Sequence, residues 1–307
     1  MSNKLKGNLL MLITAMAWGS GFAARKLGTE GFPPIAFNGL RMLGAALVLL
    51  PMAMIGLKKS GYLSREGQSY KKYKFHVYRV VAGGVACGLF LTLASTMQTI
   101  GLETASAGKS GFITSLYVVI TPLFARVFGK KIKKKTWACI VVAMIGFALL
   151  SLNEGLGSVH ACDIELLIGA AGFAAHIITV NKFVDKGNDI ILTVVQLGLC
   201  GILELIYAIP AEQPTLTQFV GCVPALLYSV IVSGAIGYGL QIVGQKYTDS
   251  TSSALILGLE SVFSAVFGAI VLGEMMAFRE LLGCLLIFAS VIYNQVDIAD
   301  LKRRKAA

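Results

Sequence analysis

The chain has 307 residues, of which 56% are hydrophobic and only 14% are charged, and its formal net charge is +11. An ordinary soluble domain has about 25% charged residues, and the apolar residues here are not spread as amphipathic stripes. They form runs of about 18 to 24 residues, the length that crosses roughly 30 Å of hydrocarbon as a helix. The composition excludes a soluble globular domain and indicates a multi-pass protein of the cell membrane.

Ten apolar runs follow one another along the chain, and each predicts a transmembrane helix. The first begins near Asn8 and is too long for the core of a signal peptide, so we expect it to be a helix of the mature protein. The expected helices cover residues 8–27, 34–56, 79–98, 104–126, 136–152, 164–182, 190–210, 221–242, 252–272 and 279–296. The sequence therefore predicts an all-α membrane protein.

The basic residues between the runs support this count and predict an orientation. With a cytoplasmic N-terminus, 22 of the 27 Lys and Arg residues fall on the cytoplasmic side, and only Arg25, Lys26 and Arg279 fall on the other. The remaining two, Arg41 and Lys109, lie inside helices. Because Lys and Arg are concentrated in cytoplasmic loops, we expect ten helices with both termini in the cytoplasm. Anionic lipid and topology explain the positive charge better than a nucleic-acid partner does.

The two halves of the chain resemble each other weakly but in a regular order. A shift of 155 positions places Trp18–Lys26 over Phe173–Asn181, and a shift of 143 or 144 places Gln98–Ile113 beside Gln241–Leu257. Each half holds five expected helices, and an odd number turns the second copy upside down in the membrane. We therefore expect two inverted five-helix repeats, residues 1–153 and 154–307. Many secondary transporters have this arrangement, with a site near the bilayer midplane.

Lys109 is a full charge within an apolar run. It lies about five residues inside the expected fourth helix, roughly 8 Å from the outer end at 1.5 Å per residue. Such a lysine either extends along its flexible stem to the interface, or faces a water-filled cavity and binds an anionic group. Its neighbours Gly108, Ser110 and Gly111 suit close helix packing better than a lipid-facing surface, which favours the cavity.

Arg41 lies about seven residues into the second helix, roughly 10 Å from the same side, and its repeat partner Gln196 is polar too. An arginine at this depth usually faces the bundle interior, either as a substrate contact or as a member of a structural ion pair. Two acids in the helices, Glu260 near mid-membrane and Glu204, are candidates for proton coupling. Glu260 is also a candidate partner of a substrate amine, or of Arg41 or Lys109 in a structural pair.

Further candidate site residues are polar or aromatic side chains within the expected helices. His176 is a candidate proton carrier because an ordinary histidine pKa lies near physiological pH, and the alternative is a hydrogen-bonded core histidine. The candidates for lining an amphipathic pocket, each with plain packing as the alternative, are Trp18, Phe22, Tyr117 and Tyr238. The repeat-aligned Gln98 and Gln241 are candidate polar contacts to substrate.

Four segments, taken as an ordered set, carry a resemblance to a known family. They are "AMAWGSGF" (Ala15–Phe22), "FNGLRMLGAAL" (Phe37–Leu47), "TASAGKSGFITSLYVVITPL" (Thr104–Leu123) and "GLESVFSAVFGAIVLGE" (Gly258–Glu274). The set resembles the EamA-type, ten-helix branch of the drug/metabolite transporter superfamily, over about residues 8–296. The resemblance implies a carrier, usually an exporter, of small metabolites such as amino acids.

Other function classes have less support in the sequence. HExxH, GxSxG and Walker motifs are absent and the six cysteines lack metal-ligand spacing, which argues against a membrane-embedded enzyme, a metal site and a cofactor. A channel or facilitator for small solutes stays open as an alternative. The expected partners are a small-molecule substrate and the lipid bilayer, with a proton or a counter-substrate as the coupling species, and no oligomeric state is predicted.

Overall fold

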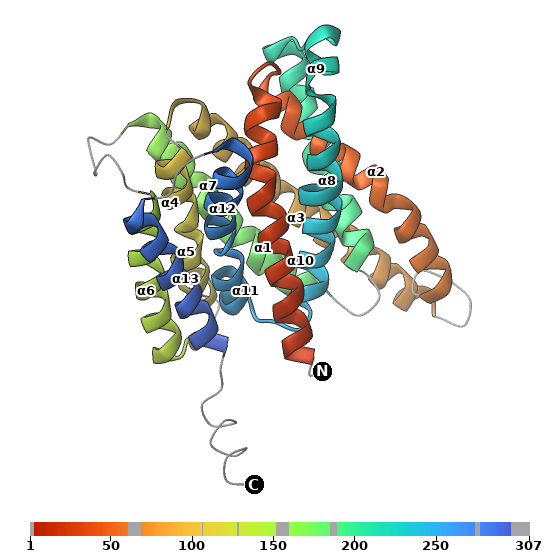
Figure 1. The fold of residues 1–307 in the computed structure, drawn as a ribbon. Helices are drawn as coiled ribbons and strands as arrows, with labels where there is room; N and C mark the ends of the chain where they lie inside the picture. Colours follow the sequence, from red (N-terminus) through yellow and green to blue (C-terminus); the bar gives the residue numbers. More distant parts are fainter. Residues whose placement is uncertain are drawn as a thin grey trace.

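The computed structural model describes residues 3–60, 69–105, 107–127, 129–151, 160–184, 189–273 and 277–295, and the regular structure in them is helical (Figure 1). The α-helices are α1 (Asn3–Thr29), α2 (Pro34–Ser60), α3 (Tyr70–Thr104), α4 (Ala107–Ser115), α5 (Tyr117–Val127), α6 (Lys134–Ser151), α7 (Ala161–Phe183), α8 (Asp189–Glu212), α9 (Leu216–Tyr228), α10 (Gly237–Gln245), α11 (Ser250–Leu257), α12 (Glu260–Leu272) and α13 (Phe278–Gln295). A π-helix, η1 (Ser229–Ile236), joins α9 to α10.

Within these described ranges the elements join into ten helical segments. Only Leu116 separates α4 from α5, only Gly258 and Leu259 separate α11 from α12, and α9, η1 and α10 follow one another without a gap. Each segment overlaps one of the ten expected helices. The prediction of an all-helical chain with ten helices is confirmed.

The outer surface of the bundle is apolar, as a lipid environment requires. Ile202, Ile206 and Ile209 follow one face of α8 and are 48%, 65% and 59% exposed. Contact of such a face with lipid chains costs no free energy, whereas its exposure to water would be unfavourable. Eight helical stretches of the described chain are long and apolar enough to cross a membrane. The two further segments, α6 and α13, pack against each other at one side of the bundle (Figure 1).

The helices pack in pairs that recur when the two halves of the chain are exchanged. Segments at equal positions in the two halves contact each other in the pairs α2 with α8, α5 with α11, and α6 with α13. Two further contacts each have a counterpart in the exchanged halves. The contact of α3 with α7 corresponds to that of the segment from α9 to α10 with α1, and the contact of α3 with α8 corresponds to that of η1 with α2. The pattern of helix contacts is therefore approximately two-fold symmetric.

Glycines permit the closest of these helix contacts. A Cβ atom added at Gly201 of α8 would lie 2.5 Å from the backbone nitrogen of Leu43 and 2.7 Å from the carbonyl oxygen of Gly39, both in α2. These are backbone atoms, which cannot turn aside as a side chain can. At Gly198, three residues earlier on α8, the nearest atom to an added Cβ is the Ala46 Cβ at 3.8 Å, an ordinary contact.

We therefore expect Gly201→Ala to destabilise the protein by about 1–3 kcal/mol, the usual cost of overpacking. Gly198→Ala is the matched control, because it makes the same exchange on the same helix without the clash, and it should leave stability unchanged or slightly higher. Thermal unfolding in detergent measures both. Equal unfolding temperatures for the two variants would contradict the close α2–α8 contact.

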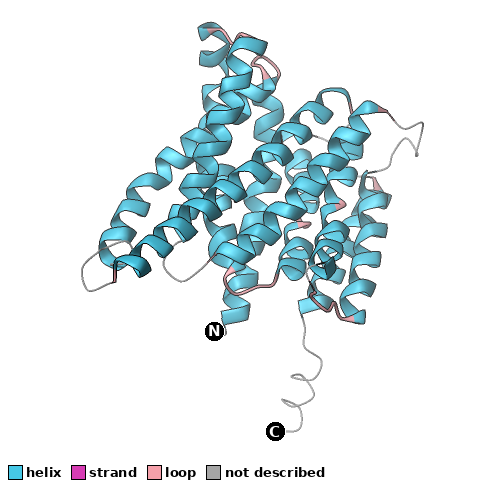
Figure 2. Ribbon diagram, turned by 180° about the vertical axis from the view of Figure 1, so that it is seen from behind, coloured by secondary structure: helices cyan, strands magenta, loops and turns pink. Residues whose placement is uncertain are grey.

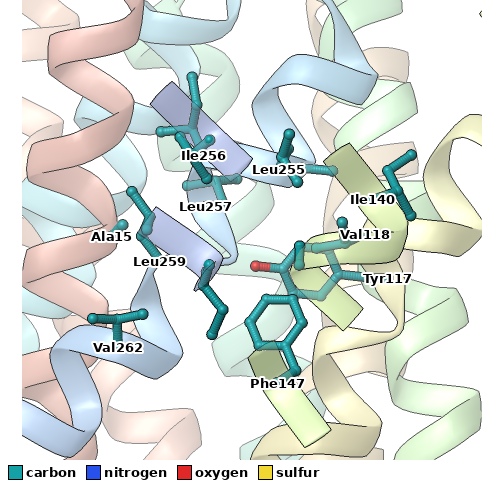
Figure 3. Packing of buried hydrophobic residues seen from close by; sticks show 14 of the residues in the cluster. Ala15, Tyr117, Val118, Ile140, Phe147, Leu255, Ile256, Leu257, Leu259 and Val262 are labelled. Atoms are coloured by element: carbon teal, nitrogen blue, oxygen red, sulfur yellow. The ribbon is translucent and has the colours of Figure 1, made fainter. Parts of the chain in front are cut away.

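Two transmembrane segments are broken near their middle, at positions that the 143-residue shift superimposes. Leu116 interrupts the segment of α4 and α5, and Leu259 interrupts that of α11 and α12. The hydroxyl oxygens of Ser115 and Ser261 lie 2.9 Å apart, so a hydrogen bond joins the two breaks. Figure 3 shows apolar side chains on both sides of them, with the Tyr117 hydroxyl pointing away from Ile140. The breaks bring the first residues of α5 and α12 into the middle of the protein.

The beginning of α1 and the end of α13 lie at the same end of the bundle (Figure 2). The Lys4 ammonium donates to the Gln295 carbonyl over 3.4 Å, and the Asn8 side-chain nitrogen donates to the Gln295 side-chain oxygen over 3.0 Å. The first and the last described helices therefore have these two ends in contact.

Candidate functional site

A cavity lies among seven of the ten helical segments. Its unfilled space, including the part open to solvent, is about 550 Å³. Its lining comes from both halves of the chain: Trp18, Phe22, Arg25, Arg41, Ser95, Gln98, Tyr117, Phe173, His176, Ile177, Ser233, Tyr238, Gln241 and Glu260. Charged, amide and aromatic groups thus surround one central space.

Most of the residues selected from sequence meet at this cavity. The nine that line it are Arg41, Glu260, Trp18, Phe22, Tyr117, Tyr238, Gln98, Gln241 and His176. Glu204 does not line the cavity and is buried behind Arg41. The backbone of Lys109 lies in α4, and its side chain is outside the part of the structure that is described. The roles of these residues in binding stay predictions.

Sequence reasoning counted Arg25 among the charges of the outer side and missed it as a residue that lines the cavity. Arg25 follows Trp18 and Phe22 at the spacing i, i+4, i+7, so the three share one helix face. A long helical side chain leans toward the N-terminal end of its helix, which carries the guanidinium back into the cavity. The sequence held this signal, because a charge in phase with two aromatic candidates belongs to their face. Ser95, Phe173, Ile177 and Ser233 were missed as well.

The cavity acid is Glu260, the first residue of α12. The Tyr117 hydroxyl, on the first residue of α5, donates a hydrogen bond of 3.0 Å to the Glu260 Oε1. A carboxylate at a helix N-terminus is favoured by the helix dipole there. The two helix breaks therefore supply an acid and the hydroxyl that orients it.

The two cavity cations are held in different ways. The Arg25 guanidinium carbon lies 4.1 Å from the centre of the Phe22 ring, and its Nη1 donates to the Gln98 Oε1 over 3.3 Å. Arg41 is only 4% exposed and donates from Nε and Nη2 to the Asn38 Oδ1, over 3.1 and 2.5 Å. Arg25 thus rests on the cavity wall, whereas Arg41 is fixed in a buried polar network.

Glu204 completes that network on the side away from the cavity. Its carboxylate accepts from the Asn38 Nδ2 at 2.8 and 2.9 Å, from the Ser95 hydroxyl at 2.7 Å and from the Thr96 hydroxyl at 3.1 Å. These partners are donors, as an ionised carboxylate requires. Asn38, which sequence reasoning also missed, links Arg41 to Glu204 through its two amide ends.

Aromatic rings and a histidine form a further part of the wall. The Trp18 and Tyr238 rings have their centres 5.0 Å apart, and the ring of His176 meets that of Tyr238 edge to face at 6.4 Å. The His176 Nε2 is 2.9 Å from the Gln196 Oε1, so this nitrogen has a hydrogen-bond partner. The Trp18 indole donates to the Ser233 carbonyl, in η1, over 3.1 Å. Most of the surface of this wall is therefore apolar, and these polar atoms are held in place by hydrogen bonds.

Gln241 presents a free amide to the cavity. Its side chain is fully buried, and neither Nε2 nor Oε1 finds a hydrogen-bond partner among the described residues. A buried polar group without a partner costs free energy, so such groups are normally satisfied by water or by a ligand. Gln241 thus offers one donor group and one acceptor to whatever occupies the cavity.

Known proteins match the chain over nearly its whole length. The model of the EamA-like transporter family matches residues 5–152 and 161–294. An uncharacterized transporter of Archaeoglobus fulgidus is 29% identical over 293 residues, covering 94% of this chain and 85% of the relative. A protein of Salmonella typhimurium named a probable amino-acid metabolite efflux pump is 25% identical over 303 residues, covering 94% of each chain. A crystal structure matches 98% of this chain and 99% of its own, with a TM-score of 0.73 at 16% identity.

The described chain is an all-helical bundle around a central cavity lined by charged, amide and aromatic side chains, an arrangement that suits a membrane transporter. The chain belongs to the EamA-like transporter family. It is a multi-pass membrane protein that moves small molecules, and it is not an enzyme. The resemblance noted in the four sequence segments is confirmed.

Proposed function

We propose that the protein is a secondary transporter that exports amino acids or similar small zwitterionic metabolites. The observation that carries the proposal is a cavity with two guanidinium groups, Arg25 and Arg41, and one carboxylate, Glu260, among five aromatic rings. An amino acid has matching parts: a carboxylate for the guanidinium groups, an ammonium for the acid and an apolar side chain for the rings. The name of the Salmonella relative supports this substrate class and the direction of transport.

Alternating access between two inverted repeats is the proposed mechanism. The family model matches the chain twice, once in each of the proposed halves 1–153 and 154–307. The helix contacts recur when the halves are exchanged, and the breaks at Leu116 and Leu259 fall at aligned positions. A site between the repeats, with half-helices that end at it, fits transport by movement of one repeat against the other.

Lys109 and the coupling groups belong to the proposal. We keep Lys109 as a second contact to the anionic end of the substrate, on the sequence argument alone. Glu260 is the proposed proton-coupling group, since its carboxylate reaches the cavity with one hydrogen bond from the described residues, that of Tyr117. His176 also lines the cavity, but its Nε2 is engaged by Gln196, and Glu204 lies outside the lining, behind Arg41.

Uptake of an amino-acid and metabolite panel into proteoliposomes, with and without a pH gradient, tests the function. We expect saturable transport of an apolar amino acid such as L-leucine. The half-saturating concentration should lie in the micromolar to millimolar range, where the KM values of enzymes for small molecules also lie. Flux that rises linearly without saturating would support a channel instead. A panel without any transported amino acid would overturn the substrate class.

The proposed orientation, with both termini in the cytoplasm, predicts the result of cysteine labelling. Lys131 lies between α5 and α6, and Ala211 lies at the end of α8, on the expected outer side. In intact cells a membrane-impermeant maleimide should label Ala211→Cys and leave Lys131→Cys unmodified until the membrane is opened. The native cysteines are buried and give a low background. External labelling of Lys131→Cys would refute this topology.

A further inference from the structure

Asn38 forms a bridge between a cavity cation and an acid outside the cavity. Its side-chain oxygen accepts from two nitrogens of Arg41, and its amide nitrogen donates to both oxygens of Glu204. The exposed fractions of Asn38, Arg41 and Glu204 are 2%, 4% and 2%. The three side chains join α2 to α8 in the interior.

A side-chain amide suits this bridge, because its oxygen can accept from two nitrogens while its NH2 group has two hydrogens to donate. A guanidinium has donors alone and an ionised carboxylate has acceptors alone, so the group between them must accept on one side and donate on the other. Aspartate at position 38 would present an acceptor to the Glu204 carboxylate, and leucine would present neither atom. The charges also fix which way the Asn38 amide points, because the reversed amide would oppose donor to donor and acceptor to acceptor.

The bridge leaves one end of Arg41 for the cavity. Arg41 and Ser95 line the cavity, whereas Glu204, to which Ser95 also donates, does not. Among the described residues, the Arg41 Nη1 has one long contact, of 3.5 Å to the Ser233 hydroxyl, which is weak and readily exchanged. A buried cation needs a counter-charge, and here that charge lies behind the guanidinium and not at its cavity end.

We propose that Asn38 and Glu204 are positioning residues that fix the Arg41 guanidinium and set the charge it presents to the anionic group of a substrate. Glu204 balances the cation at a distance, and Asn38 keeps the carboxylate at that distance. This inference rests on the proposed function for its substrate readout, and its second readout below needs no substrate.

Two variants should change specificity in opposite directions. Glu204→Gln keeps an acceptor oxygen for Ser95 and removes the counter-charge, so the KM for L-leucine should fall and that for leucinamide, which lacks the carboxylate, should rise. In Asn38→Asp the two neighbouring carboxyl groups share one proton, which brings the negative charge into direct contact with Arg41, and the variant should do the reverse. Each change should be on the order of tenfold, which corresponds to about 1.4 kcal/mol of altered interaction with the substrate charge. A purely structural role would instead impair both solutes alike in both variants.

Fluorescence quenching provides the readout that is independent of substrate. The chain has two tryptophans, so Trp137→Phe leaves Trp18, on the cavity wall, as the single reporter. Relative to quenching by neutral acrylamide, quenching of Trp18 by iodide should rise in Glu204→Gln and fall in Asn38→Asp. Glu212→Gln is the matched control: Glu212 is an acid of the same helix that accepts from the backbone N–H groups of Ile35 and Ala36.

The outcomes separate the two proposals. If the wild-type protein transports neither leucine nor leucinamide, the amino-acid function fails, while opposite iodide shifts still support the positioning of Arg41. If iodide quenching is unchanged, moves in the same direction in both variants, or changes equally in Glu212→Gln, the positioning proposal is overturned. Transport that loses both solutes equally in Asn38→Asp and Glu204→Gln overturns it as well.

Discussion

Glu260→Gln is expected to abolish accumulation driven by a pH gradient, while exchange of substrate across the membrane continues. A gradient of one pH unit supplies about 1.4 kcal/mol per proton, which supports about tenfold accumulation of a substrate coupled to one proton. The variant should therefore only equalise the inside and outside concentrations. The physical reason is that glutamine accepts the hydrogen bond from Tyr117 but cannot take up or release a proton. Proteoliposomes with an imposed gradient measure the accumulation ratio.

The control for this prediction is Glu212→Gln, since Glu212 caps α2 through the backbone of Ile35 and Ala36 and does not line the cavity. Its accumulation ratio should equal that of the wild-type protein. If Glu260→Gln accumulates substrate to the wild-type ratio, Glu260 has no part in proton coupling. In that case His176→Gln is the next variant to measure, because His176 is another titratable cavity residue.

The helix count could be predicted because the bilayer leaves the chain few options. Every backbone N–H and C=O in hydrocarbon needs an internal partner, so an apolar run of sufficient length becomes a helix. The breaks at Leu116 and at Gly258–Leu259 have no comparable signal in the sequence. Pro122 lies six residues beyond the first break, inside α5. These breaks depend on packing between segments far apart in the chain, which a local reading of the sequence does not contain.

The site could be predicted in part for the same reason. A polar or charged residue in an apolar run is costly unless it faces the interior, which is why Arg41, Glu260 and Gln241 could be selected. Asn38 satisfied the same criterion, since it lies one helical turn before Arg41 in an apolar run. The pairing of Asn38 with Glu204 could not have been selected, because α2 and α8 come together only in the fold.

Arg25→Ala is expected to weaken substrate binding by roughly 10- to 150-fold without loss of folding. A hydrogen bond to a charged group contributes about 1.5–3 kcal/mol, and about 1.4 kcal/mol corresponds to tenfold in affinity. Arg25 is held by the face of Phe22 and by Gln98. Neither partner is an ion, so truncation of Arg25 leaves no charged partner of these contacts buried alone. The half-saturating concentration for L-leucine uptake and the unfolding temperature in detergent measure the two effects.

Arg41→Ala is the comparison variant for this prediction. Both arginines line the cavity, but truncation of Arg41 leaves the Glu204 carboxylate buried without its counter-charge, and breaking a buried pair typically costs about 3–5 kcal/mol. Arg41→Ala should therefore lower the unfolding temperature sharply, whereas Arg25→Ala should affect affinity alone. Arg25→Lys should recover part of the affinity, because an ammonium keeps the charge but does not stack its plane on Phe22. Normal leucine uptake by Arg25→Ala would show that Arg25 does not contact the substrate, and the anionic end would then be assigned to Arg41.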